Sequence, residues 1–387
     1  MNLRDKRIIL GVTGSVAVYK ALDVASLLGQ VGAIVDVIMT DRAQEFISPL
    51  TFQSITGRKV YTKMFTDPDR TLEQMYLAER ADLVVIAPIT ANFVAKMTTG
   101  VADDLLSLIV LATKAPVVVA PAMTANMYAN STTQDNLVKL TQRGVIEIPP
   151  DWGYLIGGFR GKGRLAGCET IVDTLRQVLG EEGDLKDVKV VITAGGTRES
   201  LGKGLFLANP ASGKMGMELA REFRDNGALV TLIEANTREE PPVGTRVLSV
   251  DSTQELFDTV LRESENASVL VMAASLPEYL PRKSQFDPEN GIAVKKTPNI
   301  FQLVSKDLIT VGFVTKSAGF SKDAAIMKLY REGLDIIVAS RSQGGGGYSQ
   351  ISLIEKDGSV TNLPLQTKEH VAREVIRKVI KTLKPNS

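Results

Sequence analysis

The chain is poor in the residues that build disulfides, metal clusters and stacking surfaces. Its 387 residues include one cysteine, Cys168, one histidine, His370, and one tryptophan, Trp152. A single cysteine excludes an intrachain disulfide framework and any zinc or iron–sulfur site made of several thiolates. A single histidine excludes a histidine-cluster metal site and leaves at most one imidazole for acid–base work near neutral pH. We therefore expect no metal site and a reducing compartment.

Surplus charge and long hydrophobic runs are also lacking. Lys and Arg number 45 against 44 Asp and Glu, a net charge of +1, and aromatic residues make up 5% of the chain. Such a chain offers no strong field or aromatic platform, so we expect neither nucleic acid nor a membrane as partner. The longest apolar runs, 83–89 and 115–123, are far shorter than the roughly 20 residues of a spanning helix. No signal-type segment follows Met1, and we expect a cytoplasmic protein.

Two similar α/β patterns follow one another along the chain. The length alone favours two or three domains. Continuous Val/Ile/Leu runs alternating with helical patterns are typical of a parallel sheet covered on both faces. In the first half we expect strands at 7–12, 33–39, 83–87 and 116–120, with helices that include 15–31 and 42–56.

A polar, glycine-containing stretch at 180–187 interrupts this pattern, which then restarts. In the second half we expect strands at 188–193, 228–233, 268–272, 310–313 and 335–339, a helix at 213–226, a hairpin at 350–360 and a last helix at 368–383. The sequence therefore predicts two doubly wound, Rossmann-like α/β domains, 1–180 and 187–387.

A glycine turn joins the first expected strand to the first expected helix. Its sequence, GVTGS at 11–15, would present free backbone N–H groups at a helix N-terminus, where phosphate groups bind. The third glycine of the dinucleotide fingerprint is absent, so the turn favours a mononucleotide over NAD. A tight glycine turn at this point also serves plain packing.

Three more segments of the first half have ligand-site character. Residues 87–92 (APITAN) and 120–127 leave strands at the edge where parallel sheets bind ligands, although Thr90 and Asn92 are also good helix caps. Residues 153–165 hold five glycines and three cations, Arg160, Lys162 and Arg164. That composition predicts a flap that closes over an anion, or otherwise a solvated loop.

The second half carries its own glycine-rich turns, at 191–198 (VITAGGTR) and 209–216 (NPASGKMG). The segment SGKMG at 212–216 opens an expected helix, which predicts a second phosphate cradle. Its spacing differs from that of the P-loop, so a Walker site is excluded.

These segments, in this order, resemble the bifunctional flavoproteins of coenzyme A biosynthesis, which join phosphopantothenoylcysteine decarboxylase to phosphopantothenate–cysteine ligase. The segments that carry the resemblance are 11–15, 81–92, 103–104, 121–123, 161–165, 192–199 and 212–216. The resemblance implies an FMN-binding decarboxylase-like domain of the flavodoxin-like HFCD type, followed by a ligase-like domain that uses CTP with Mg²⁺. It also implies a phosphopantetheine-type thiol as substrate and a trimer-based or larger homo-oligomer.

The resemblance also implies positions for the bound groups. FMN contacts fall on Gly14, Ser15, Thr40, Phe46, Pro88, Thr90, Ala91, Asn92 and Met123, and the flap supplies Arg160, Lys162 and Arg164. Nucleotide contacts fall on Gly195, Asn209, Ser212, Gly213, Lys214, Ala273, Ala274, Glu278, Thr297, Pro298, Asn299, Ile300, Phe313 and Lys328.

The chain departs from the family pattern at the positions of the decarboxylase chemistry. Gln74 stands where the family has a histidine, and Thr124 stands where an asparagine holds the substrate carboxylate. Gly157 stands where many members have a proton-donating cysteine. A neutral glutamine cannot exchange a proton at pH 7, and threonine offers one hydroxyl in place of an amide. We therefore expect decarboxylation to be weak or absent and the FMN cradle to be intact.

The ligase half departs as well. The family's Arg-x-x-Ser-Asn reads LFLAN at 205–209, which keeps Asn209 and loses the arginine, and Glu332 replaces an expected lysine. A carboxylate beside a triphosphate is repulsive, so we expect CTP binding to be less secure than FMN binding. Three hypotheses follow: a coenzyme A enzyme that retains one activity, an FMN flavoprotein repurposed for a specialised pathway, and a non-catalytic regulatory or binding paralogue.

Overall fold

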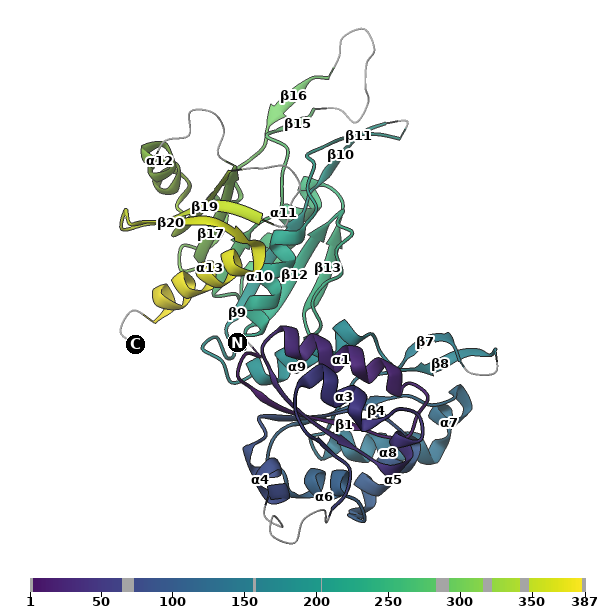
Figure 1. Cartoon of the computed structure of the whole chain (residues 1–387). Coiled ribbons are helices and arrows are strands. Elements are labelled where there is room, and N and C mark those ends of the chain that lie inside the picture. The colour runs from purple at the N-terminus through teal and green to yellow at the C-terminus, as the bar shows by residue number, and fades with distance from the viewer. Residues whose placement is uncertain are drawn as a thin grey trace. The chain divides into compact units, whose positions relative to one another are not determined.

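The computed structural model describes residues 3–64, 73–155, 158–202, 204–282, 292–315, 322–341 and 348–384. Its contacts divide the chain into two compact units, Met1–Leu179 and Gly180–Ser387 (Figure 1). Each unit has buried apolar clusters of its own.

The first unit is built on a six-stranded parallel sheet in the order β3-β2-β1-β4-β5-β6. Its strands are β1 Arg7–Val12, β2 Ile34–Met39, β3 Val60–Tyr61, β4 Leu83–Ile89, β5 Val117–Pro121 and β6 Ile146–Glu147. Residues of β4 are buried throughout, which explains the continuous apolar run in the sequence.

Helices cover both faces of this sheet. One face is packed by α1 Val18–Gln30, α3 Pro49–Thr56 and α9 Cys168–Gly180, through side chains such as Val24, Phe52 and Leu175. The other face is packed by α4 Glu73–Arg80, α5 Ala91–Thr99, α6 Leu105–Ala112 and α8 Ser131–Gln142. The predicted doubly wound architecture is therefore confirmed for the first half.

One local expectation for this unit is wrong. The single helix expected at 42–56 is split into α2 Asp41–Gln44 and α3, because Ser48 caps α3 with its hydroxyl and Pro49 occupies the first helical turn. The segment expected to be a flap or a solvated loop contains an antiparallel hairpin, β7 Asp151–Tyr154 with β8 Arg160–Arg164, and its closure over an anion stays a prediction.

Glycine in this hairpin is needed for packing. A Cβ on Gly163 would lie 2.3 Å from the carbonyl oxygen of Met123, so only glycine permits the hairpin to approach the loop after β5. That loop contains the short helix α7 Ala125–Ala129.

The second unit is built on an eight-stranded sheet in the order β13-β12-β9-β14-β17-β18-β19-β20. Its strands are β9 Lys189–Gly195, β12 Leu229–Ala235, β13 Arg246–Val250, β14 Val269–Met272, β17 Ile309–Thr315, β18 Ile336–Arg341, β19 Tyr348–Glu355 and β20 Val360–Thr367. The first six strands in that order are parallel, and β19 and β20 extend the sheet as an antiparallel hairpin.

Helices α10 Lys214–Arg224 and α13 Lys368–Leu383 pack on one face of this sheet, and α11 Thr253–Ser264 and α12 Lys322–Glu332 pack against other side chains of it. The predicted α/β architecture of the second half is confirmed. Two small hairpins project from it (Figure 1): β10 Arg198–Gly202 with β11 Leu205–Ala208, and β15 Tyr279–Pro281 with β16 Val294–Lys296.

Among the described residues, no helix is long and apolar enough to cross a bilayer. In the same part of the chain, no three His, Cys, Asp or Glu side chains gather as a metal-binding group.

Candidate functional site

A cavity of about 520 Å³ opens in the first unit where β1, β4 and β5 end, next to the β7–β8 hairpin. Of the predicted flavin contacts, Gly14, Ser15, Thr90 and Met123 line it. The carboxyl edge of a parallel sheet is where ligands of such folds bind, because helix N-termini and loops converge there.

Short hydrogen bonds join the three strand ends around this cavity. The Thr13 hydroxyl donates to the Pro88 carbonyl oxygen at 2.8 Å and accepts from the Thr90 amide at 3.0 Å. The Ser15 hydroxyl donates to the Ala122 carbonyl oxygen at 3.2 Å. These bonds hold the loop after β1 against the loops after β4 and β5, so the cavity wall is fixed without a ligand.

The turn before α1 has two backbone donors without an acceptor among the described residues. Gly14 and Val16 both line the cavity, and no acceptor among the described residues bonds to their backbone N–H groups. A Cβ on Gly14 would lie 2.4 Å from the Arg42 Cβ, so this position requires glycine. These two N–H groups lie in the turn four and two residues before Val18, the first residue of the 13-residue helix α1, where the helix N-terminus favours an anion.

Two cations line the cavity in addition. The Lys20 ammonium donates to the Leu165 carbonyl oxygen at 3.3 Å, and Arg164 lies in the same wall. Burial, and after it the nearby Arg164 charge, lowers the pKa of Lys20. Sequence reasoning missed Lys20, since it lies within the expected helix and outside the glycine motif; a lysine one turn after that motif is the signal that could have indicated it.

The other predicted flavin contacts lie outside the cavity lining. Thr40 follows β2 and caps α2, and Pro88 forms a cis peptide bond with Ala87 near the end of β4. Ala91 and Asn92 open α5, and Phe46 is 54% exposed.

The three flap cations behave differently from one another. The Arg160 guanidinium stacks on the Tyr154 ring at 4.3 Å and donates to its hydroxyl at 2.6 Å. The Lys162 ammonium lies 5.5 Å from the Tyr128 ring centre. Of the three, Arg164 alone lines the cavity. Arg160 therefore joins the two strands of the hairpin, whereas Lys162 contacts an aromatic ring on α7.

The predicted nucleotide cradle of the second unit is formed by loops that bond to one another. Gly195 ends β9 at φ +83°, where a Cβ would lie 1.9 Å from the Ala235 carbonyl oxygen. The Gly196 amide donates to that oxygen at 2.8 Å, and the Ser275 amide donates to the Gly195 carbonyl oxygen at 2.8 Å. This places the loops after β9, β12 and β14 side by side.

The start of α10 joins the same group of loops. Gly213 caps the helix at φ +81°, and the Lys214 amide donates to the Ser212 hydroxyl at 3.4 Å. The Thr237 hydroxyl donates to the Ser212 carbonyl oxygen at 2.9 Å. Thr237 was missed by sequence reasoning, because a lone threonine after a strand carries no motif.

Three further hydrogen bonds involve residues on or next to the predicted nucleotide contacts. The Asn209 amide donates to the Leu276 carbonyl oxygen at 2.7 Å, and the Thr297 amide donates to the Glu278 carbonyl oxygen at 2.9 Å. The Ala274 amide, next to Ala273, donates to the buried Thr193 hydroxyl at 3.0 Å. The residues that follow Thr297 are Pro298, Asn299, which caps a 3₁₀ helix, and Ile300, which is buried.

Two predicted nucleotide contacts lie on other elements. Phe313 belongs to β17 and packs against the core, and Lys328 lies on α12. The Lys328 ammonium is 3.9 Å from the Glu332 carboxylate, which also accepts from Arg331 at 3.4 Å. Glu332 therefore offsets the positive charge of Lys328 and Arg331.

Comparison with known proteins agrees with both halves. A family model described as "Flavoprotein" matches residues 1–180, and one described as "DNA/pantothenate metabolism flavoprotein C-terminal domain" matches residues 185–383. The "Coenzyme A biosynthesis bifunctional protein CoaBC" of Haemophilus influenzae is 35% identical over 396 residues, which cover 98% of both chains. The chain belongs to the CoaBC family. The resemblance stated from its motifs is thereby confirmed.

The CoaBC protein of Bacillus subtilis shows the same extent of match, 35% identity over 396 residues, 97% of each chain. With the two family models and these full-length relatives, the chain has the two-part organisation of the bifunctional coenzyme A biosynthesis flavoproteins. Among solved structures, a CoaBC C-terminal domain is 28% identical and covers 53% of this chain and 100% of that chain, with a TM-score of 0.48.

Three positions of this CoaBC family member differ from the family's decarboxylase residues. Thr124 lines the cavity and caps α7, its hydroxyl accepting from the Met127 amide at 3.4 Å. Gln74 lies in α4, but its side chain is outside the described part of the structure. Residue Gly157 as a whole is outside the described part.

The one thiol and the one imidazole lie elsewhere. The Cys168 thiol donates to the Lys20 carbonyl oxygen at 3.6 Å, burial raises its pKa, and it does not line the cavity. His370 is on α13 in the second unit, 3.8 Å from Glu374, with its side chain 41% exposed.

Proposed function

We propose that the chain binds FMN in the cavity of the first unit. The observation that carries this proposal is the pair of free N–H groups at Gly14 and Val16 beside Lys20 and Arg164, in a cavity of about 520 Å³. A volume of that size is typical of pockets for small molecules, and two cations with a helix N-terminus suit a phosphate dianion. Bound FMN would supply the oxidation that precedes loss of CO₂ from a cysteinyl carboxylate.

We propose that the substrate of this half is 4′-phosphopantothenoylcysteine and that its decarboxylation is weak or lost. The support is chemical: Gln74 cannot exchange a proton near pH 7, and the Thr124 hydroxyl is engaged in capping α7. A substrate carboxylate that enters the cavity would still meet Lys20 and Arg164.

We propose that the second half is a ligase that activates phosphopantothenate with CTP and Mg²⁺ before cysteine attacks. Gly213 and Lys214 at the start of α10, together with Gly195, supply the glycine-rich, cationic environment that a phosphate chain needs. Glu332 pairs with Lys328 and so reduces the positive charge available to the triphosphate of CTP. CTP binding should therefore be weaker than FMN binding.

We propose further that the chain functions as a homo-oligomer, trimer-based or larger. Helix α4, which carries Gln74, packs on the face of the sheet opposite to α1, and none of its described residues lines the cavity. A residue at position 74 that acts on the cavity contents would then come from a second copy of the chain. We also propose that this assembly is cytoplasmic, in line with the sequence analysis.

The test measures both half-reactions in the full chain. The protein is incubated with phosphopantothenate, cysteine, CTP and Mg²⁺, and release of pyrophosphate and of CO₂ is followed separately, beside the Haemophilus influenzae relative. We expect CTP-dependent pyrophosphate release with much slower CO₂ release than in the relative. Equal rates of CO₂ release would refute the divergence, and the absence of both products would refute the assignment.

A second candidate is an FMN flavoprotein that acts on another cysteinyl carboxylate in a specialised pathway. Its support is the contrast between a complete cavity wall and altered residues at 74, 124 and 157. A panel of peptides with C-terminal cysteine separates the two candidates: CO₂ release from a peptide, and none from phosphopantothenoylcysteine, favours the second.

A further inference from the structure

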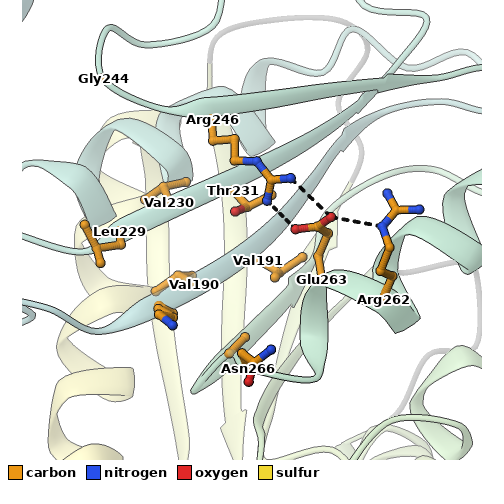
Figure 2. A pocket seen from close by; sticks show the side chains of 12 residues that line it. Val190, Val191, Leu229, Val230, Thr231, Gly244, Arg246, Arg262, Glu263 and Asn266 are labelled. Atoms are coloured by element: carbon orange, nitrogen blue, oxygen red, sulfur yellow. Dashed lines mark hydrogen bonds and ion pairs between the residues drawn. The ribbon is translucent and has the colours of Figure 1, made fainter.

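A second cavity, of about 400 Å³, lies in the second unit at the edge of the sheet where β9, β12 and β13 begin (Figure 2). Lys189, Leu229 and Arg246 are the first residues of these strands, and all three line it. The predicted nucleotide cradle begins at Gly195, the last residue of β9, six residues after Lys189. At about 3.3 Å per residue the two ends are roughly 20 Å apart, so the two places are distinct.

A shared carboxylate organises the charges of this second cavity. Glu263 accepts hydrogen bonds from Arg246 and from Arg262, whose Nε lies 3.1 Å from it, and Figure 2 shows it between the two guanidinium groups. Its side chain is 12% exposed. Burial opposes ionisation of Glu263, but the hydrogen bonds from both arginines outweigh it and lower the pKa of this carboxyl. Glu263 is therefore an anion that fixes the orientation of both guanidinium groups.

The positive charge of the cavity exceeds what Glu263 neutralises. Lys189, Arg246 and Arg262 contribute three positive charges against one negative charge, which leaves a net charge of +2 among the lining residues. The carbonyl end of α11, which ends at Ser264, carries a partial negative charge that offsets a fraction of this surplus. The balance still favours a divalent anion.

Several donors in the lining have no partner in the protein. Within the described residues, no hydrogen bond or ion pair engages the Lys189 ammonium or the Asn266 amide, and Arg262 uses its Nε alone, on Glu263. The Thr231 hydroxyl is likewise unbonded within the described chain. The terminal N–H groups of such a guanidinium can donate two parallel hydrogen bonds to phosphate oxygens, while one carboxylate holds its Nε.

We propose that this cavity binds a small phosphate monoester, at a site separate from the flavin cavity and the nucleotide cradle. Arg262 and Lys189 hold the phosphate oxygens, Arg246 is held in place by Glu263, and Asn266 and Thr231 bond to the organic part of the ligand. The proposal rests on the described geometry of the second unit and is independent of whether FMN or CTP binds.

The test uses the full chain and glycerol 3-phosphate as the probe, at constant ionic strength set with chloride. Titration calorimetry measures affinity, and hydrogen–deuterium exchange locates the site. We expect saturable binding with protection of segments 244–248 and 262–268. Arg262→Gln should weaken binding about tenfold or more, and Lys189→Gln, which disturbs no ion pair, should weaken it severalfold.

Arg377→Gln is the matched control, because it removes a surface arginine that is paired with a carboxylate on the same helix, as Arg262 is. It should leave the affinity unchanged, and thermal melting verifies that all variants are folded. Equal affinity of the Arg262 and Arg377 variants would overturn the proposal. Protection confined to segment 195–214 would assign the probe to the nucleotide cradle instead, and equal protection by sulfate or chloride would show charge screening alone.

Discussion

The first and second units both place a glycine turn and a helix N-terminus at the carboxyl edge of a parallel sheet, and in both units the surrounding loops bond to one another. The two units differ in the charged side chains near the turn. In the first, Lys20 and Arg164 line the cavity together with Gly14 and Val16, whose N–H groups have no acceptor among the described residues. In the second, Lys328, a predicted nucleotide contact, is paired with Glu332.

This difference indicates which substitutions should weaken ligand binding in each unit. If the first cavity binds FMN as proposed, steric change at the Gly14 turn should weaken that binding most. If the second unit binds CTP as proposed, we expect its affinity to depend on side-chain charges such as Lys214, Lys328 and Glu332. The two halves of one CoaBC-type chain should therefore respond to different substitutions.

The largest expected effect is a gain of decarboxylation in the first unit. Gln74→His combined with Thr124→Asn should raise CO₂ release by about 10²- to 10⁴-fold, the range typical of general acid–base catalysis. The rate is measured with phosphopantothenoylcysteine. The control Gln74→Asn with Thr124→Asn adds no titratable group and should show no such gain. If both double variants release CO₂ equally, the missing histidine is not what limits the reaction.

The next effect concerns the glycine turn. Gly14→Ala should weaken FMN binding about 10- to 100-fold, because a Cβ there would lie 2.4 Å from the Arg42 Cβ and relief would cost about 1–3 kcal/mol. Fluorescence titration of the apoprotein measures the affinity. Gly29→Ala is the control, since a Cβ at Gly29 on α1 meets nothing within 4 Å. Unchanged FMN affinity in the Gly14 variant would place the flavin elsewhere.

A smaller effect is expected from charge in the second unit. Glu332→Lys should tighten CTP binding about tenfold, since it removes the carboxylate that pairs with Lys328 and Arg331 and adds a cation. Calorimetry with CTP and Mg²⁺ measures the change. Glu181→Lys, which alters an exposed carboxylate at the beginning of this unit, controls for net charge. The same gain from both variants would mean that Glu332 has no specific effect.

The smallest effect is a change of protonation in the first cavity. Arg164→Gln should raise the pKa of Lys20, because one cause of its depression is removed while burial, the larger cause, stays. Carbon-13 NMR of reductively methylated lysines follows the titration of this ammonium. Arg160→Gln, on the same hairpin but outside the cavity lining, should leave it unmoved. A fall in the pKa of Lys20 in the Arg164 variant would contradict the described geometry.

The sequence predicted the sheets well, because buried parallel strands such as β4 and β9 are continuous apolar runs bounded by turns. It failed where local chemistry overrode the pattern. The helical period continues through Ser48 and Pro49, yet that pair begins a new helix. The β7–β8 hairpin has no apolar alternation, and its strand pairing depends on the packing of Gly163 against the loop after β5.

The site residues also divide into those that sequence motifs indicated and those that they did not. Gly14, Ser15 and Thr90 are indicated by motifs beside strand ends, and they line the first cavity. Arg164, which the sequence placed among the flap cations, lines it too. Lys20 and Thr237, which sequence reasoning missed, bond to the Leu165 and Ser212 carbonyl oxygens, contacts between segments far apart in the sequence or outside any motif. Motifs therefore identify the glycine turns and part of the polar groups around them, whereas the remaining partners require the fold.

The measurement that tests the central claim most directly is the visible absorption spectrum of the purified full chain, before and after addition of phosphopantothenoylcysteine. We predict flavin bands that persist through gel filtration and neither bleach nor shift on mixing at the rate shown by the Haemophilus influenzae relative. Bleaching at that rate would show that redox chemistry survives without the histidine. A colourless chain that takes up no added FMN would contradict the assignment of the first cavity.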